Sequence, residues 1–208
     1  LFFNYMSSTI GTDTELSAVN SILGSIGQAP LIELDYTNPE HSFVFNILRE
    51  ARIDVLNEGW HFNREENVTL SPQTSTNYIL YPSDALRVDV TGNQFDRTTD
   101  VVKREGKLYD KVNKTYTFIK PIKADIVRAY DFEDIPSVYQ RYITYRAATR
   151  AATQLVANPQ LVQLLGQQEA IARASCMEYE CNQGDHNFMG FPSNSSYQTY
   201  QPYTALRR

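Results

Sequence analysis

The sequence predicts an α+β protein in which a discontinuous four-helix bundle carries an inserted antiparallel β domain and an extended C-terminal tail. Apolar residues recur at helical spacing in residues 12–59 and again in 131–184, whereas residues 60–130 show the period of two that is typical of strands. Each pair of helices presents an apolar stripe that it cannot bury alone, so we expect the two pairs to pack together. Residues 185–208 show neither period, which predicts an extended arm.

The composition excludes several classes of protein. The chain has 208 residues, of which 42% are apolar and 21% charged, enough for one or two folded domains. Its net charge of −5 argues against tight binding of nucleic acid through phosphates, which needs clustered Lys and Arg. No apolar run approaches the roughly 20 residues of a membrane-spanning helix, and LFFNYMSSTI lacks the features of a signal peptide. We therefore expect a soluble protein without membrane insertion.

Capping residues mark the first two helices. Thr12, with a Glu three residues later, is the predicted cap of the first helix, and Gly27 closes it. The second helix begins with Asn38 as its cap and Pro39 in its first position, and it ends before Gly59. The apolar stripes of the two helices are Leu16, Val19, Leu23 and Ile26, and Val44, Leu48, Ala51 and Val55.

Residues 60–130 predict five to eight short strands separated by turn sequences. The best hairpin is VVKREGKLYDKV, in which Gly106 supplies a positive φ between two alternating runs. Trp60, the single tryptophan, follows the stop signal of the second helix and precedes Phe62 at strand spacing. We interpret Trp60 and Phe62 as the domain-junction anchor, large rings packed where the bundle meets the sheet.

The helical period returns after the β region. Asp134 is the predicted cap and Pro136 lies in the first turn of a helix that Asn158 and Pro159 break. A fourth helix runs from Pro159 to Tyr179, with Gly184 as its end. The predicted stripes are Val138, Tyr142, Tyr145, Ala152 and Val156 on the third helix, and Leu161, Leu164, Leu165, Ala172 and Cys176 on the fourth.

Residue patterns typical of catalysis or ligand binding are weak. Glu65 or Glu66 with Asp84 or Asp89 could form a carboxylate pair for glycoside hydrolysis, but charged residues beside strands are usually solvated. Phosphate-binding glycine motifs are missing, and the histidines stand apart from any metal-ligand companion: His41, His61 and His186. We predict no enzyme, no catalytic residue, no metal and no cofactor.

Four arginines make the two late helices locally basic: Arg141, Arg146, Arg150 and Arg173. We interpret them as a solvated or subunit-pairing face in preference to a DNA contact, because the chain is acidic overall. Cys176 and Cys181 lie five residues apart on one predicted helix, a spacing that disfavours pairing, so we expect reduced thiols.

Four segments together resemble the tail tubular protein A family, the adaptor or gatekeeper proteins of short-tailed bacteriophages. The segments are ELSAVNSILGSIGQAP (15–30), GWHFNREENVTLSP (59–72), YDFEDIPSVYQRYITYRAATR (130–150) and ASCMEYE (174–180). Each is weak alone, but their order and distances form a specific signal. The resemblance spans most of residues 13–183, and the middle of the β region and the tail match poorly.

The resemblance implies a structural protein of the virion tail, assembled in the host cytoplasm, that forms a homo-oligomeric ring of twelve copies. Such a ring would join the portal protein to the tail nozzle protein, receive the tail fibre and let DNA pass through its lumen. By the same analogy the C-terminal arm would contact the portal, with aromatic, apolar and basic anchors. These anchors are Phe191, Tyr197, Tyr200, Tyr203, Leu206, Arg207 and Arg208.

Two other functions remain open at this point. The β region could be a tail-associated module that binds a glycan or a fibre, with Trp60 or exposed tyrosines stacking on sugar rings. A glycan-cleaving tail enzyme with Glu65 or Glu66 as its acid is the more distant alternative.

Overall fold

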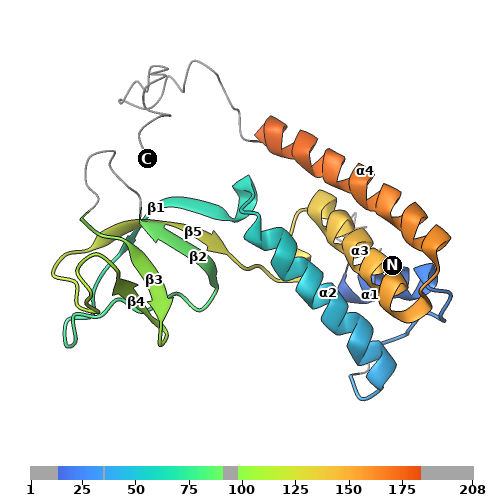
Figure 1. Ribbon diagram of the computed structural model, residues 1–208, viewed down its shortest axis with the longest axis horizontal. Helices are drawn as coiled ribbons and strands as arrows, with labels where there is room; N and C mark the ends of the chain where they lie inside the picture. Colours follow the sequence, from blue (N-terminus) through green and yellow to red (C-terminus); the bar gives the residue numbers. More distant parts are fainter. Residues whose placement is uncertain (1–13, 35, 91–97, 184–208) are drawn as a thin grey trace, which may run out of the picture.

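The computed structural model describes residues 14–34, 36–90 and 98–183, and it is a mixed α+β structure (Figure 1). The helices gather at one end of the long axis and the strands at the other. The helices are α1 (Glu15–Ser25), α2 (Pro39–Asn57), α3 (Ser137–Ala151) and α4 (Pro159–Gln183). The strands are β1 (Arg64–Leu70), β2 (Ala85–Val90), β3 (Val101–Arg104), β4 (Lys107–Asp110) and β5 (Ile122–Arg128). The predicted α+β class is therefore confirmed.

The cap of α1 differs from the prediction. Thr14, not Thr12, is the N-cap residue, and its hydroxyl accepts a hydrogen bond from the backbone N–H of Ser17. Because both threonines precede the same apolar stripe, the sequence pattern left the start ambiguous by two residues. The C-terminal prediction is confirmed: Gly27 has a φ of 80°, and the N–H of Gln28 bonds to the carbonyl of Leu23 in a Schellman arrangement.

Helix α2 follows its sequence signals closely. The side chain of Asn38 accepts from the N–H of Glu40, and Pro39 occupies the first turn, where its missing N–H costs no helical bond. The predicted stripe is buried along its whole length. The left-handed Gly59, with a φ of 77°, follows the helix and turns the chain towards the sheet.

The described residues of the β half form five strands, which agrees with the lower bound of the predicted five to eight. Strands β1, β5 and β2 form an antiparallel sheet in that order, and β3 pairs with β4. The β3–β4 hairpin turns through Glu105 and Gly106, whose φ values of 51° and 72° suit the tight turn predicted there. The core of this half is Ile79, Ala85, Val88, Val101, Leu108, Phe118, Ala124 and Ile126.

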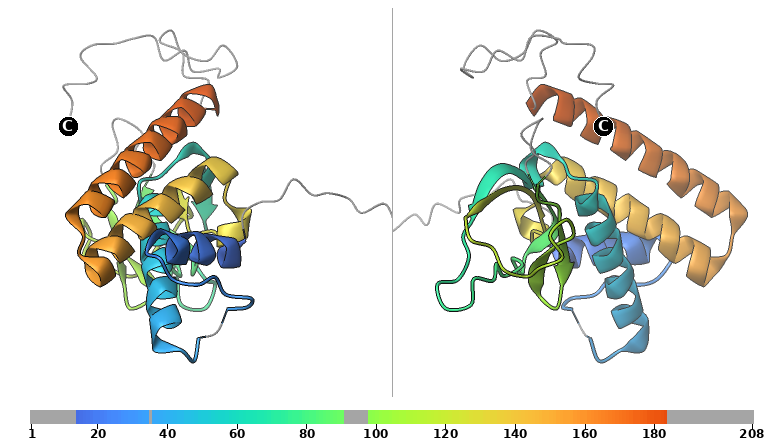
Figure 2. Two further views of the ribbon diagram at one scale, coloured as in Figure 1. Left: turned by 90° about the vertical axis from the view of Figure 1, so that its right-hand side faces the viewer. Right: turned by 60° about the vertical axis from the view of Figure 1, so that its left-hand side comes forward.

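Helix α3 begins later than predicted. Asp134 ends a short 3₁₀ turn (Phe132–Asp134), and the N-cap position of α3 is Pro136. The predicted stripe of α3 is partly wrong, because Val156 is exposed whereas Tyr139 and Ile143 are fully buried. Since α3 packs against α1, α2 and α4, it buries more of its circumference than a single stripe. Figure 2 shows it lying between α4 and α1.

Helix α4 is the outermost helix of the structure (Figures 1 and 2). A π turn (Ala152–Val156) and the left-handed Ala157 separate it from α3, and Asn158 caps its start, as the predicted break requires. Ala172 and Cys176 of its predicted stripe are buried, but Leu164 is 61% exposed, which contradicts its assignment to the core. The helix is described as far as Gln183. In the described part of the chain, no helix has the length and hydropathy needed to cross a bilayer.

Candidate assembly surfaces

Aromatic rings fill the place where the helices meet the sheet. Trp60 is 5% exposed, its indole N–H donates to the carbonyl of Val55 at 2.8 Å, and its ring lies 4.9 Å from that of Tyr139. Phe62 lies 4.6 Å from Tyr139 and 6.3 Å from Tyr130, which follows β5. We call Trp60, Phe62, Tyr130, Tyr139 and Tyr179 the junction cluster. Because Trp60 is buried, its ring is not available to stack on a sugar.

The end of α4 is tied to this cluster by one carboxylate. Glu180 accepts the hydroxyl of Tyr139 through one oxygen and the backbone N–H of His61 through the other, both at 2.8 Å. The ring of Tyr179 meets Tyr139 edge-on at 5.8 Å. Burial, with the carboxylate of Glu180 beside it, raises the pKa of the Tyr139 hydroxyl well above its ordinary value. Tyr139 therefore stays a neutral donor.

The sheet is joined to α2 by a buried amide. Asn63 is fully buried, and its side-chain nitrogen donates to the carbonyl of Leu56 at 2.8 Å and to that of Arg128 at 3.0 Å. The first carbonyl lies in the last turn of α2, and the second belongs to the last residue of β5. A single amide thus bonds a helix terminus and a strand terminus that lie far apart in the sequence.

Three of the four arginines on the late helices are used inside the molecule. Arg146 of α3 and Arg173 of α4 both pair with the carboxylate of Glu58, at 3.2 and 3.1 Å, and Arg150 pairs with Asp54. Glu58 and Asp54 lie at the end of α2. These contacts clamp α2, α3 and α4 together and draw those three cations away from any external partner.

Arg128 holds the carboxylates that could have formed a catalytic pair. Its Nε lies 2.7 Å from one oxygen of Glu65, and its Nη1 pairs with Asp84. Glu66 instead pairs with Arg64 at 3.2 Å. Glu65 and Asp84 are therefore engaged in one ion-pair network on the sheet. In the portion of the chain that the structure describes, no group of three or more His, Cys, Asp or Glu could hold a metal ion.

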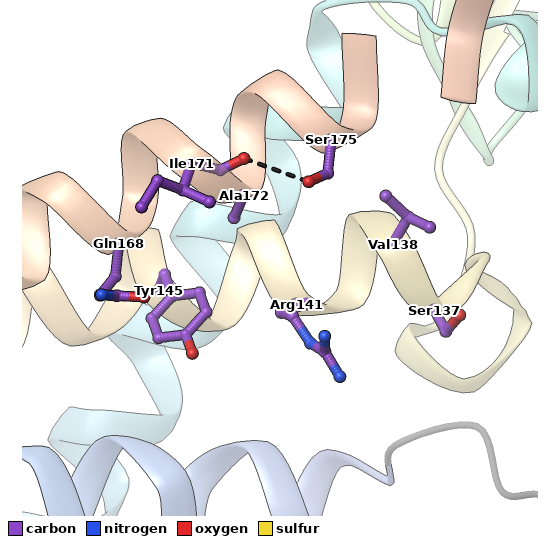
Figure 3. A pocket seen from close by; sticks show the side chains of 8 residues that line it. All are labelled: Ser137, Val138, Arg141, Tyr145, Gln168, Ile171, Ala172 and Ser175. Atoms are coloured by element: carbon purple, nitrogen blue, oxygen red, sulfur yellow. Dashed lines mark hydrogen bonds between the residues drawn. The ribbon is translucent and has the colours of Figure 1, made fainter. Parts of the chain in front are cut away.

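A shallow pocket of ≈ 290 Å³ lies between α3 and α4 (Figure 3). Its α4 wall includes Ile171, which is 59% exposed, and Ser175, whose hydroxyl bonds back to the carbonyl of Ile171. Its α3 wall includes Tyr145 and Arg141, and Figure 3 shows the Arg141 side chain pointing away from α4. Leu164, seven residues before Ile171, falls on the same side of α4. Together they leave an apolar flank exposed.

Sequence reasoning missed several residues that organise these surfaces. Tyr139, Glu58 and Glu180 were not singled out, because their partners are distant in the chain. The clustering of lysines, in contrast, can be read directly from the sequence, because all six lysines of the chain fall within residues 103–123. The predicted portal-contact arm, from Phe191 to Arg208, lies outside the described residues. Both cysteines are free, with Cys176 buried and Cys181 exposed, which confirms the expectation of unpaired thiols.

Comparison with known proteins identifies the family. The sequence model of the family described as tail tubular protein matches residues 16–186. The chain is also similar to tail tubular protein A of Klebsiella phage KP34, with 32% identity over 122 residues. That alignment covers 59% of this chain and 62% of the relative, so the chain spans less than two thirds of the relative's length. This chain belongs to the tail tubular protein family, and it is a structural component of a bacteriophage tail.

Proposed function

We propose that this chain is the ring-forming adaptor of the tail, of which twelve copies connect the portal protein to the tail nozzle protein. The family match over residues 16–186 carries the proposal. In this role the ring encloses part of the DNA ejection channel, through which DNA passes without specific contact, and offers a docking surface for the tail fibre. Assembly takes place in the host cytoplasm before the protein reaches the virion tail.

The described surface supports an assembly role. Only Ala172 and Cys176 of the long helix α4 are buried, while Leu164, Ile171 and Met177 are 61%, 59% and 48% exposed. A helix that hides so little of its surface is typical of a subunit that gains its remaining contacts from neighbours. The helices would then act as the discontinuous bundle expected from residues 12–59 and 131–184, with 60–130 as the inserted β domain.

Electron microscopy tests the proposal directly. The purified chain, alone or mixed with portal protein, should form closed rings in negative-stain images, and the rings should show twelvefold symmetry. A chain that stays monomeric with and without portal would overturn the adaptor role.

The C-terminal arm has its own test. We propose that residues 185–208 contact the portal, with Tyr197, Tyr200 and Tyr203 among its anchors. Deleting residues 190–208 should leave a folded protein, by circular dichroism, that no longer attaches to portal rings in a pull-down. Attachment at the full-length level would remove the arm from the portal interface.

A tail-associated glycan- or fibre-binding module is the alternative. The burial of Trp60 removes the strongest sugar-stacking candidate from its glycan version. Binding of a bacterial surface glycan by the isolated chain, with no ring in any condition, would favour the module over the adaptor.

A further inference from the structure

The charge of the molecule is divided between two regions. Residues 103–123 carry seven cationic and two acidic side chains, a net charge of +5, which leaves −10 on the rest of the chain. This basic segment comprises the end of β3, the β3–β4 turn, β4 and the connection to β5. A chain that is acidic overall therefore presents one compact basic region at its β end (Figure 1).

Several cations of this region rest on tyrosine rings. Lys107 lies 4.4 Å from the ring centre of Tyr78, and Arg104 lies 4.1 Å from that of Tyr109. Tyr116 stands between these rings, 6.4 Å from Tyr78 and 4.9 Å from Tyr109. The five residues form a continuous row, which we call the cationic face. Leu80, 52% exposed and bridged to Lys107 across the sheet, adds an apolar side chain beside it.

Within the described residues, the charges of the cationic face have no acidic partner. Among the described residues, neither Arg104 nor Lys107 forms an ion pair, whereas the nearby Lys111 pairs with Asp100. The tyrosine rings orient the two cations, and no described carboxylate compensates their charge. A partner that docks here must therefore bring carboxylates or phosphates.

A complementary surface lies between β5 and α3, where the sheet leads into the helical half. Asp131, Glu133 and Asp134 lie on the 3₁₀ turn before α3, all exposed, and we call them the acidic turn. Within the described residues, the cation paired with this turn is Arg52, 3.9 Å from Asp131 and closer to Glu15 at 3.1 Å. The acidic turn therefore also carries excess charge, and no described lysine reaches it within the subunit.

We propose that the cationic face docks on the acidic turn of a neighbouring copy of this chain. Two different, complementary patches on one subunit make a head-to-tail contact, which closes into a ring when its rotation angle permits. The inference rests on the proposed ring and names the surfaces that join its subunits. Tyrosine, arginine and an exposed leucine suit a protein partner, and two oriented cations are few for a duplex, whose binding needs many phosphate contacts.

Zero-length cross-linking tests the contact. Rings assembled from equal amounts of ¹⁴N- and ¹⁵N-labelled chain are treated with a carbodiimide, which couples lysine to carboxylate. We expect mixed-isotope peptides that join Lys107 to Asp131, Glu133 or Asp134. Lys111 and Asp100 should give same-isotope peptides, which serves as an internal control for contacts within a subunit. Mixed-isotope peptides that join Lys107 only to carboxylates outside the acidic turn, or no mixed-isotope peptide of Lys107 at all, would overturn the proposal.

Charge reversal provides the second test. The double variant Arg104→Glu, Lys107→Glu should raise the protein concentration needed for ring formation at least tenfold. The double variant Glu133→Lys, Asp134→Lys should do the same. The four changes combined should restore assembly. Lys120→Glu with Lys123→Glu is the matched control, because it changes the net charge as much as the first pair does, at exposed positions that contact no described tyrosine ring. This control variant should form oligomeric rings normally.

The outcomes separate this inference from the proposed function. Normal oligomeric rings from the Arg104→Glu and Lys107→Glu variant would overturn the inference alone. So would a combined variant that does not recover ring assembly. If the unmodified chain forms no rings, either alone or with portal protein, the adaptor role itself is overturned. Circular dichroism of each variant confirms that a loss of rings does not come from unfolding.

Discussion

At the scale of single residues, Tyr139 joins parts of the chain that are distant in sequence. Its ring contacts Trp60, Phe62 and Tyr179, and its hydroxyl donates to Glu180. The two bonded residues are 41 positions apart. A phenylalanine ring would fill the same space as the ring of Tyr139. The contribution of the hydroxyl is therefore the hydrogen bond that it donates to the partly buried carboxylate of Glu180.

Tyr139→Phe should lower the free energy of unfolding by about 1–2 kcal/mol, because it removes the donor and keeps the ring. Urea denaturation followed by circular dichroism measures the change. Tyr36→Phe is the matched control, since Tyr36 is 55% exposed and should shift the midpoint little. Equal effects of the two substitutions would show that the bond to Glu180 contributes nothing specific.

The two cysteines should differ sharply in reactivity. Burial raises the pKa of the Cys176 thiol to about 12, whereas Cys181 is exposed. In the folded protein at pH 8, Ellman's reagent should modify Cys181 within minutes and reach Cys176 only after denaturant is added. Rapid modification of both thiols in the native protein would contradict the burial of Cys176.

The same thiol predicts a pH dependence of stability. Its pKa is 9.0 when unperturbed and about 12 in the fold, so its contribution is present below pH 9 and is lost as the pH rises towards 12. The unfolded state releases the proton first, and stability falls. Cys176→Ala should therefore flatten the decline of the urea midpoint above pH 9, relative to Cys181→Ala. Parallel curves for the two variants would count against it.

At the scale of elements, two glycines show how the backbone conformation decides the effect of adding a side chain. Gly166 lies within α4 with no heavy atom within 4 Å of an added Cβ, whereas Gly106, equally unobstructed, has a φ of 72° in the β3–β4 turn. Alanine suits the first backbone and is strained in the second.

Gly166→Ala should raise the free energy of unfolding by about 0.5–1 kcal/mol, and Gly106→Ala should lower it by about 1 kcal/mol. Thermal or urea unfolding of the two variants measures these opposite shifts. Because neither added methyl group meets another atom, a shift of the same sign in both variants would show that backbone conformation does not explain the difference.

At the scale of the whole molecule, the junction cluster decides whether helices and sheet unfold together. Asn63 bonds α2 to β5, and the rings of Trp60 and Phe62 pack on α3. Contacts that cross between the two halves at this point predict one cooperative transition. The proposed subunit contact, in contrast, joins the cationic face of one copy to the acidic turn of the next.

Phe62→Ala should uncouple the two halves. Trp60 is the single tryptophan, so its fluorescence reports the junction, while circular dichroism at 222 nm reports the helices. We expect the two signals to coincide during urea unfolding of the unmodified chain. In the variant, the fluorescence transition should move to lower urea than the helical one. Coincident transitions in Phe62→Ala would show that the junction does not set cooperativity.

The sequence by itself determined the local architecture. The Asn38 cap, the Schellman turn at Gly27, the hairpin at Gly106 and the break at Asn158 all follow from side-chain and backbone preferences within a few residues. The apolar stripe of α2 was equally readable, because a helix buried on one face repeats its apolar residues at a fixed spacing.

Only the tertiary structure decided which surfaces are buried and which charges are satisfied. Helix α3 is covered on several sides, so one stripe could not identify Tyr139, and α4 leaves Leu164 exposed although its spacing suits a core. The arginine partners of Glu58 are 88 and 115 positions away, and the carboxylate partners of Arg128 are 44 and 63 positions away. The physical reason is that periodicity reports one element at a time, whereas burial and ion pairing depend on which elements meet.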